Sequence, residues 1–133
     1  MRTGKTIVAD QKKILVIDDE VDFLKALGGY LKREGYAVST CSSCRRGLNR
    51  AKKEPYDLIL VDIKMPGMDG IDAIKQIERV RRKAQFIIIT GYAITEDVVS
   101  LIKQDKRVHG YLLKPFNLNE LMSRTKDILE ERK

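Results

Sequence analysis

Five short apolar runs alternate with longer segments of mixed polarity along the chain. The runs cover residues 14–17, 36–38, 58–61, 86–89 and 108–113. Their first residues are 22, 22, 28 and 22 positions apart, which leaves room for a helix between successive parallel strands. Because Ile, Val and Leu are continuous rather than alternating in these runs, we expect strands that are buried on both faces of a sheet. The second run is the least apolar, so we expect it near a sheet edge.

The segment after the first run shows the periodicity of a helix. Its apolar residues between positions 23 and 31 fall on one helical face, and Gly35 is placed to end the helix. Gly28 and Gly29 lie inside this helix, where each glycine costs about 1 kcal/mol relative to alanine. Packing must therefore override helix propensity at these two positions.

Three further helices have recognisable starts. Asp69 is placed to cap one helix, Thr95 opens the next with acids in its first turn, and Asn117 caps the last. We therefore predict an α/β fold of the (βα)5 type, a doubly wound parallel five-stranded sheet with helices on both faces.

Composition places the chain among soluble single-domain proteins. Of 133 residues, 43% are hydrophobic and 34% are charged. We expect residues 1–12 to form a basic N-terminal tail and residues 13–133 to form the domain. No apolar run approaches the roughly 20 residues of a membrane span, and no secretory signal is recognisable, so we expect a cytoplasmic protein without membrane association.

The net charge of +7 is compatible with a nucleic-acid-binding protein. The basic residues are densest in residues 45–53 and 79–83. Basic stretches on helices are usually solvated faces, and neither segment contains an aromatic residue that would stack on bases. Direct nucleic-acid binding by this domain is therefore disfavoured.

Chemically reactive residues follow four of the five apolar runs. Asp18 and Asp19 follow the first run, Asp62 the third, Thr90 the fourth and Lys114 the fifth. Since the carboxyl ends of parallel strands share one edge of a sheet, these side chains are expected to meet there. Each alone has an ordinary interpretation, such as a helix cap or a surface amine. Their complementary charges together indicate a site.

Crowded carboxylates repel one another unless a cation offsets their charge. Mg²⁺ suits a site with few carboxylates and no nearby Cys or His. Beside Mg²⁺, a carboxylate can act as a nucleophile on phosphorus, and Asp62 is the best candidate. Thr90 would then donate to one phosphoryl oxygen, and Lys114 would neutralise another. Glu20, which follows the acidic pair, is compatible with helix capping alone.

Four stretches resemble the receiver domain of bacterial two-component response regulators. They are residues 14–20 (ILVIDDE), 57–70 (DLILVDIKMPGMDG), 89–91 (ITG) and 111–116 (YLLKPF). The resemblance spans about residues 12–131, and it implies the flavodoxin-like strand order 2-1-3-4-5. It also implies a signalling domain rather than an enzyme that turns over an external substrate.

The resemblance further implies a role for each site residue. Asp62 would accept a phosphoryl group from a phosphohistidine of a sensor histidine kinase or a phosphotransfer protein. Mg²⁺ would be held by Asp18, Asp19, Asp62 and the backbone carbonyl of Lys64. Thr90 and Lys114 would bind phosphoryl oxygens, Lys114–Pro115 would be a cis peptide, and Tyr111 would turn inward when Thr90 moves. The surface of the fourth helix, fifth strand and fifth helix would then signal to an output domain or a target protein.

The sequence departs from the receiver pattern in two places. Arg107 and Val108 stand where receivers often carry glycine and alanine, so we expect a differently shaped end of the fourth helix. Lys64 and Tyr92, two positions after Asp62 and Thr90, vary in the family and influence phosphoryl lifetime.

Two other functions stay open. A Mg²⁺-dependent phosphatase would form the same aspartyl phosphate, but such enzymes place a second acid where this chain has Lys64. They also need a substrate cap, for which 133 residues leave no room. A nucleic-acid or scaffold module with a vestigial pocket is the third function, and the intact set of five polar residues argues against it.

Cys41 and Cys44 form a C-x-x-C motif, which can be redox-active at the turn between a strand and a helix. Thioredoxin-like proteins combine this motif with aromatic or proline neighbours and a different strand order. We therefore interpret the two cysteines as apolar core residues.

Overall fold

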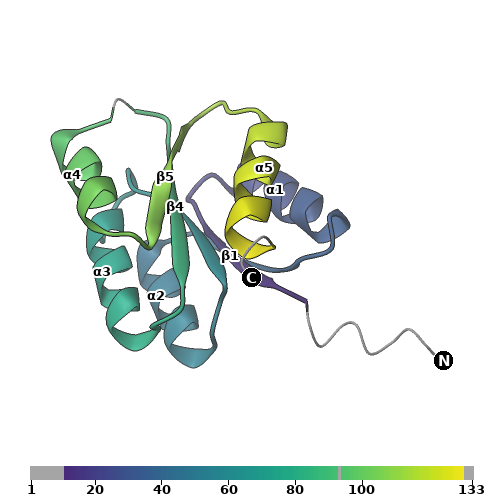
Figure 1. The fold of residues 1–133 in the computed structure, drawn as a ribbon, viewed down its shortest axis with the longest axis horizontal. Helices are drawn as coiled ribbons and strands as arrows, with labels where there is room; N and C mark the ends of the chain where they lie inside the picture. The colour runs from purple at the N-terminus through teal and green to yellow at the C-terminus, as the bar shows by residue number, and fades with distance from the viewer. Residues whose placement is uncertain (1–10, 93, 131–133) are drawn as a thin grey trace.

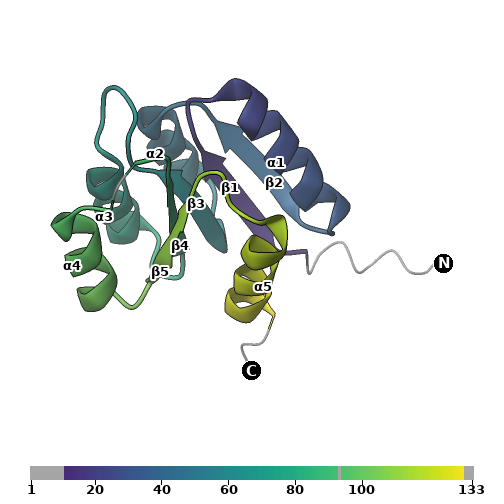
Figure 2. The same cartoon turned by 90° about the horizontal axis from the view of Figure 1, so that it is seen from above.

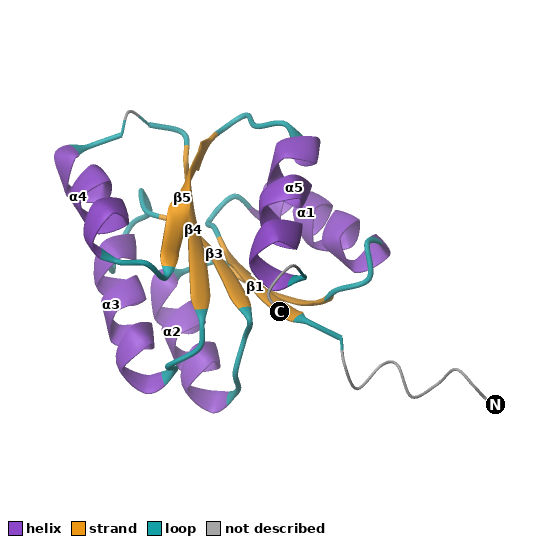
Figure 3. Cartoon of the chain, viewed as in Figure 1, coloured by secondary structure: helices purple, strands orange, loops and turns teal. Residues whose placement is uncertain are grey.

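The computed structural model describes residues 11–92 and 94–130 as five strands and five helices in strict alternation (Figures 1 and 3). The elements are β1 (Lys13–Ile17), α1 (Val21–Arg33), β2 (Ala37–Cys41), α2 (Cys44–Lys53), β3 (Leu58–Asp62), α3 (Gly70–Val80), β4 (Gln85–Thr90), α4 (Glu96–Gln104), β5 (Val108–Leu113) and α5 (Leu118–Leu129). All strands are parallel, in the order β2-β1-β3-β4-β5, so the predicted fold and strand order are confirmed. Most of the predicted N-terminal tail, residues 1–10, lies outside the described residues, as do residues 131–133.

The sheet separates two apolar cores. Helices α2, α3 and α4 cover one face and α1 and α5 cover the other (Figure 1). Strand β1 shows the alternation, because Leu15 and Ile17 pack on the first face and Ile14 and Val16 on the second. Strands β1, β3 and β4 are buried almost throughout, whereas the predicted edge strand β2 is only partly buried. No helix within the described ranges has the length and apolarity of a membrane span.

The predicted helix starts are capped by their own side chains. The Asp69 carboxylate accepts a hydrogen bond from the Ile71 N–H, Thr95 accepts one from Val98, and Asn117 accepts two from the first turn of α5. Gly35 has a positive φ of 102° directly after Glu34, the C-cap of α1, as its predicted role as a helix stop requires. These local signals fix where the helices begin and end.

Arg107 accounts for the first departure from the receiver pattern. Its guanidinium donates to the backbone carbonyls of Ala84 at 2.8 Å and of Arg81, and it lies 4.0 Å from the Glu78 carboxylate. Its own backbone N–H donates to the carboxylate of Asp105, the C-cap of α4. A single side chain thereby ties the end of α3, the start of β4 and the turn before β5 together.

The two cysteines are core residues, as predicted. Cys41 and Cys44 are both buried and both free of a disulfide bond. Burial raises the pKa of both thiols, that of Cys44 to about 11, so neither is an activated thiolate at neutral pH.

Gly28 and Gly29 have different reasons to be glycine. A Cβ added at Gly28 would lie 3.2 Å from the Thr40 Cγ2 of β2, whereas a Cβ at Gly29 would meet only the flexible Arg33 guanidinium at 3.5 Å. The expected packing compensation is therefore present at Gly28, where α1 approaches the sheet closely, and not at Gly29.

We expect Gly29→Ala to raise the free energy of unfolding by about 0.5–1 kcal/mol through helix propensity. Gly28→Ala should be less stable than Gly29→Ala, because its Cβ must displace Thr40. Urea denaturation of both variants and the wild type measures this difference. Equal gains at the two positions would contradict the close approach of α1 to β2.

Candidate functional site

Four strands deliver polar side chains to the carboxyl edge of the sheet. Asp18 follows β1, Asp62 and Thr90 are the last residues of β3 and β4, and Lys114 follows β5. Asp18, Asp62 and Thr90 are all buried, which makes them exceptional among the apolar residues of the sheet. The Thr90 carbonyl accepts the Lys114 N–H at 2.8 Å, which ties the last two strand ends together. The predicted convergence at one edge is therefore observed.

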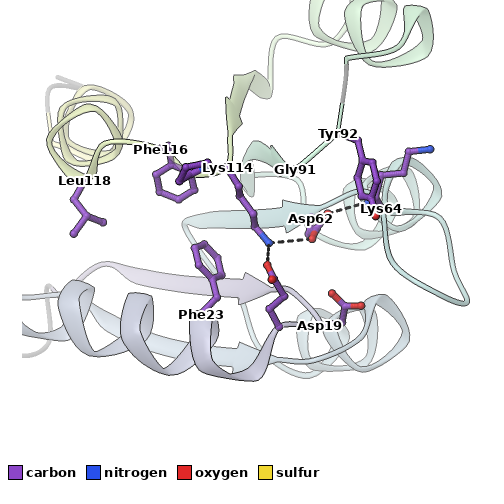
Figure 4. A pocket seen from close by; sticks show the side chains of 11 residues that line it. Asp19, Phe23, Asp62, Lys64, Gly91, Tyr92, Lys114, Phe116 and Leu118 are labelled. Atoms are coloured by element: carbon purple, nitrogen blue, oxygen red, sulfur yellow. Dashed lines mark hydrogen bonds and ion pairs between the residues drawn. The ribbon is translucent and has the colours of Figure 1, made fainter.

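A hollow of about 810 Å³ opens at this edge (Figure 4). Asp19, Asp62 and Lys114 line it, and Figure 4 shows the Lys114 chain reaching from the end of β5 toward Asp62. Thr90 does not line the hollow, because its side chain is fully buried and its hydroxyl oxygen accepts the Tyr92 N–H at 3.1 Å. The hydroxyl proton of Thr90 remains available for a hydrogen bond to a bound group.

Three carboxylates form a compact acidic cluster. One carboxylate oxygen from each of Asp18, Asp19 and Asp62 lies within 4.8 Å of the others. The Asp18 carboxylate accepts the N–H of Glu20, and the Asp62 carboxylate accepts the N–H of Lys64 at 2.9 Å. These two short turns hold the buried carboxylates in place while Asp19 remains exposed.

Lys114 is the cation that faces this cluster. Its Nζ lies 2.5 Å from a carboxylate oxygen of Asp18, 2.5 Å from one of Glu20 and 3.3 Å from one of Asp62. Burial alone would lower the pKa of Lys114, but the contacts with Asp18 and Glu20 and the charge of Asp62 raise it above its ordinary value. Lys114 is therefore fully protonated at neutral pH and offsets part of the acidic charge.

The environment of Asp62 is unfavourable to the charge of its carboxylate. Burial and the neighbouring Asp18 raise its pKa, while the Lys64 N–H and Lys114 act in the opposite direction. The net shift is upward, so one ammonium does not fully compensate the cluster. A further positive charge near Asp62 would stabilise its ionised form.

The cluster fits a divalent cation. The Asp18 Oδ2 atom is buried, and the Lys114 ammonium lies 2.5 Å from it. Oxygen ligands in this number suit a hard cation that keeps several of its waters. The described residues thus offer three carboxylate ligands for such an ion.

Several predicted residues lie around this centre. Lys64 and Tyr92 are exposed neighbours, with the Lys64 Nζ 5.9 Å from the centre of the Tyr92 ring (Figure 4). Tyr111 lies in β5 and is 37% exposed, so its side chain is on the surface rather than in the core. The Lys114–Pro115 peptide bond is cis.

Sequence reasoning missed two contacts of Lys114, with Glu20 and with Phe23. Glu20 stands at the N-cap of α1, yet its side chain makes no capping hydrogen bond and binds Lys114 instead, so the interpretation of capping alone is wrong. Phe23 lies under the ammonium, 4.4 Å from Nζ to the ring centre, and packs edge-on against Phe116. The poor capping ability of glutamate was the signal that Glu20 has another partner.

The sequence and the structure resemble those of known proteins. The family model for the response regulator receiver domain matches residues 14–126. The alkaline phosphatase synthesis transcriptional regulatory protein PhoP of Bacillus subtilis is 36% identical over 118 residues, which are 89% of this chain and 48% of PhoP. The chain thus spans about half the length of this curated relative.

Two solved structures have the same fold. The CheY-like response regulator receiver domain protein from Methanospirillum hungatei superposes with a TM-score of 0.83 at 31% identity, over 91% of this chain and 95% of that one. The response regulator TrrA from Thermotoga maritima, solved in complex with Mg²⁺-BeF, has a TM-score of 0.78 at 31% identity, over 90% and 100% of the two chains. TrrA has also been solved in complex with the histidine kinase ThkA, with a TM-score of 0.76.

The charge balance of the site predicts opposite effects of two substitutions on stability. Asp62→Asn removes a carboxylate that burial disfavours, so it should raise the free energy of unfolding at pH 7 by on the order of 1 kcal/mol. Lys114→Met leaves the buried Asp18 without its cation and should lower the free energy of unfolding by about 3 kcal/mol. Thermal unfolding in a buffer with a chelator measures both effects.

The pH dependence provides the control. A carboxyl with a raised pKa costs stability only above the pKa that it has in the unfolded chain, so the gain from Asp62→Asn should shrink as the pH falls toward 4. A gain that is constant from pH 4 to pH 7 would show that the carboxylate charge is not its cause.

Proposed function

The chain belongs to the family of response regulator receiver domains, and on this premise we propose that Asp62 is the residue that accepts a phosphoryl group. Receiver domains act as signalling proteins. The observation that carries the proposal is the position of Asp62, a buried carboxylate at the end of the central strand β3 with an ammonium 3.3 Å away. No other described carboxylate combines that burial with a place in the pocket wall.

The phosphodonor is the phosphohistidine of a sensor histidine kinase or of a phosphotransfer protein. A carboxylate oxygen of Asp62 forms a bond to phosphorus as the bond between phosphorus and the imidazole nitrogen breaks, and the imidazole leaves with the bonding pair. The known complex of the neighbour TrrA with a histidine kinase supports this class of partner. Donor and acceptor need only be aligned, so the receiver supplies the groups that stabilise the transferring charge.

Asp18, Asp19 and Asp62, with the backbone carbonyl of Lys64, would hold Mg²⁺. The bound ion would supply positive charge to the phosphoryl oxygens and screen the carboxylates from one another. The N–H of Lys64 already binds Asp62 and so keeps the Lys64 backbone beside the cluster. The Mg²⁺-BeF complex of TrrA supports magnesium as the ion.

Lys114 and Thr90 respond to the phosphoryl group. Lys114 exchanges its contact with the exposed Glu20 for one with a phosphoryl oxygen, which carries more negative charge. Thr90 moves toward the phosphoryl group, which vacates space beside β4 for Tyr111 to turn inward. The altered surface of α4, β5 and α5 then docks a target protein or an output domain.

We expect acetyl phosphate with Mg²⁺ to add one phosphoryl group to the wild-type protein without any kinase, because the receiver carries the charge-stabilising groups itself. Asp62→Asn should gain no mass, while Asp69→Asn, which alters only an exposed helix cap, should be phosphorylated like the wild type. Intact-protein mass spectrometry follows the reaction. Equal phosphorylation of wild type and Asp62→Asn would place the nucleophile elsewhere.

The metal assignment gives a second prediction. Asp19→Asn should weaken Mg²⁺ binding by roughly tenfold or more, since it removes one of three charged ligands. Asp22→Asn is the matched control, because Asp22 is an exposed acid in the first turn of α1 outside the cluster. Calorimetric titration with Mg²⁺ compares the variants, and undiminished affinity in Asp19→Asn would remove that residue from the site.

A further inference from the structure

A second hollow of about 470 Å³ lies beside the open edge of the sheet, where α1 and α2 flank the end of β2. Strand β2 pairs with β1 on one side only and lies at the edge of the sheet beside α1 (Figure 2). The hollow shares no lining residue with the one around Asp62. We refer to it as the β2 groove.

The backbone of β2 has hydrogen-bonding groups along the open edge of the sheet, and Thr40 on this edge lines the β2 groove. The Ala37 N–H donates to the Lys12 carbonyl, and the Cys41 carbonyl accepts the Asp18 N–H, so both residues face β1. Because backbone groups alternate in direction along a strand, Val38 and Thr40 direct their N–H and C=O groups toward the open edge. The edge thus presents two donors and two acceptors in a regular row.

All charged side chains that line the β2 groove are basic. Lys25 of α1 and Arg46, Arg50 and Lys53 of α2 line it, and no acidic residue does. Arg50 is paired with Glu54 at 3.2 Å, but no ion pair with another described residue engages Lys25, Arg46 or Lys53. Three uncompensated cations therefore surround the strand edge.

The groove also has apolar lining. Val21 and Leu24 of α1 line it on one face of the sheet, and Val21 is 54% exposed. Cys41 contributes on the other face, where it packs in the core with α2. A segment lying along β2 would therefore meet apolar atoms and Lys25 on the α1 side and three basic side chains on the α2 side.

We propose that the β2 groove binds an acidic, extended segment of a partner protein, which pairs with β2 as a sixth strand. Alternate side chains of such a strand point to opposite faces, so acidic residues at every second position face α2 and apolar residues between them face α1. The main chain of the segment pairs with Val38 and Thr40. Pairing between two copies of this chain at the same edge is opposed, because it would bring like charges together.

A polypeptide fits this groove better than a nucleic acid does. The carbonyls of Val38 and Thr40 need donors, which a peptide N–H provides and a phosphate oxygen cannot. No aromatic side chain lines the groove to stack on a base. The uncompensated cations select acidic strands, and the backbone pairing selects an extended main chain.

The test is a titration of the isotope-labelled protein with a blocked eight-residue peptide of alternating glutamate and valine, followed by nuclear magnetic resonance. We expect shifts and slowed hydrogen exchange at the Val38 and Thr40 amides. The double variant Arg46→Glu/Lys53→Glu should bind the peptide at least tenfold more weakly. Lys103→Glu/Lys106→Glu makes the same charge change at exposed positions around the end of α4 and should retain the affinity.

Three results would overturn the proposal. The first is that the glutamate peptide does not bind. The second is that both double variants lose the same amount of affinity. The third is that a lysine–valine peptide or an eight-nucleotide oligothymidine binds as tightly as the glutamate peptide. Asp62→Asn should bind the glutamate peptide like the wild type. The peptide-binding test therefore does not depend on whether Asp62 is the phosphorylation site.

Discussion

The central constraint in this molecule is the burial of two carboxylates, Asp18 and Asp62, at the edge of an apolar sheet. Burial makes a carboxylate charge costly unless positive charge lies close by. Lys114 supplies part of that charge from the end of β5, at 2.5 Å from Asp18 and 3.3 Å from Asp62. The upward shift in the pKa of Asp62 shows that the compensation is incomplete. The rest of the site follows from this shortage of positive charge.

The proposed function depends on this shortage of positive charge around Asp18 and Asp62. A carboxylate that lacks full compensation favours a divalent cation, and the cation in turn makes the same edge suitable for a phosphoryl group. Lys114 is shared between Glu20 and the buried acids, so its position depends on which negative charge is nearest. The exposed Tyr111 lies three residues before it on the edge strand β5, and the Lys114 N–H donates to the Thr90 carbonyl. The proposed movement of Lys114 and Thr90 would act on the strand that carries this ring.

Much of this architecture could be predicted from local patterns. The continuous apolar runs predicted buried parallel strands, and Asp69, Thr95 and Asn117 marked helix starts because a capping side chain acts within three residues. The placement of Asp18, Asp62, Thr90 and Lys114 followed from the rule that parallel strands end at one edge. Strand order came only from the resemblance to receiver domains, because the spacing of the runs is equally compatible with other orders.

Contacts between residues distant in the sequence were beyond local reasoning. Glu20 and Lys114 are 94 positions apart, and the pattern around Glu20 is that of a helix start. Arg107 was recognised only as a departure, since its partners Ala84 and Glu78 belong to other elements. The β2 groove depends on which strand lies at the sheet edge and on which helices flank it.

A crystal structure of the protein with Mg²⁺ and beryllofluoride tests the central claim most directly. The account predicts beryllium bound to a carboxylate oxygen of Asp62, one fluorine within hydrogen-bond distance of the Lys114 Nζ and another beside the Thr90 hydroxyl, with Lys114 detached from Glu20. Beryllofluoride on a different carboxylate, or Lys114 unmoved between Asp18 and Glu20, would contradict it.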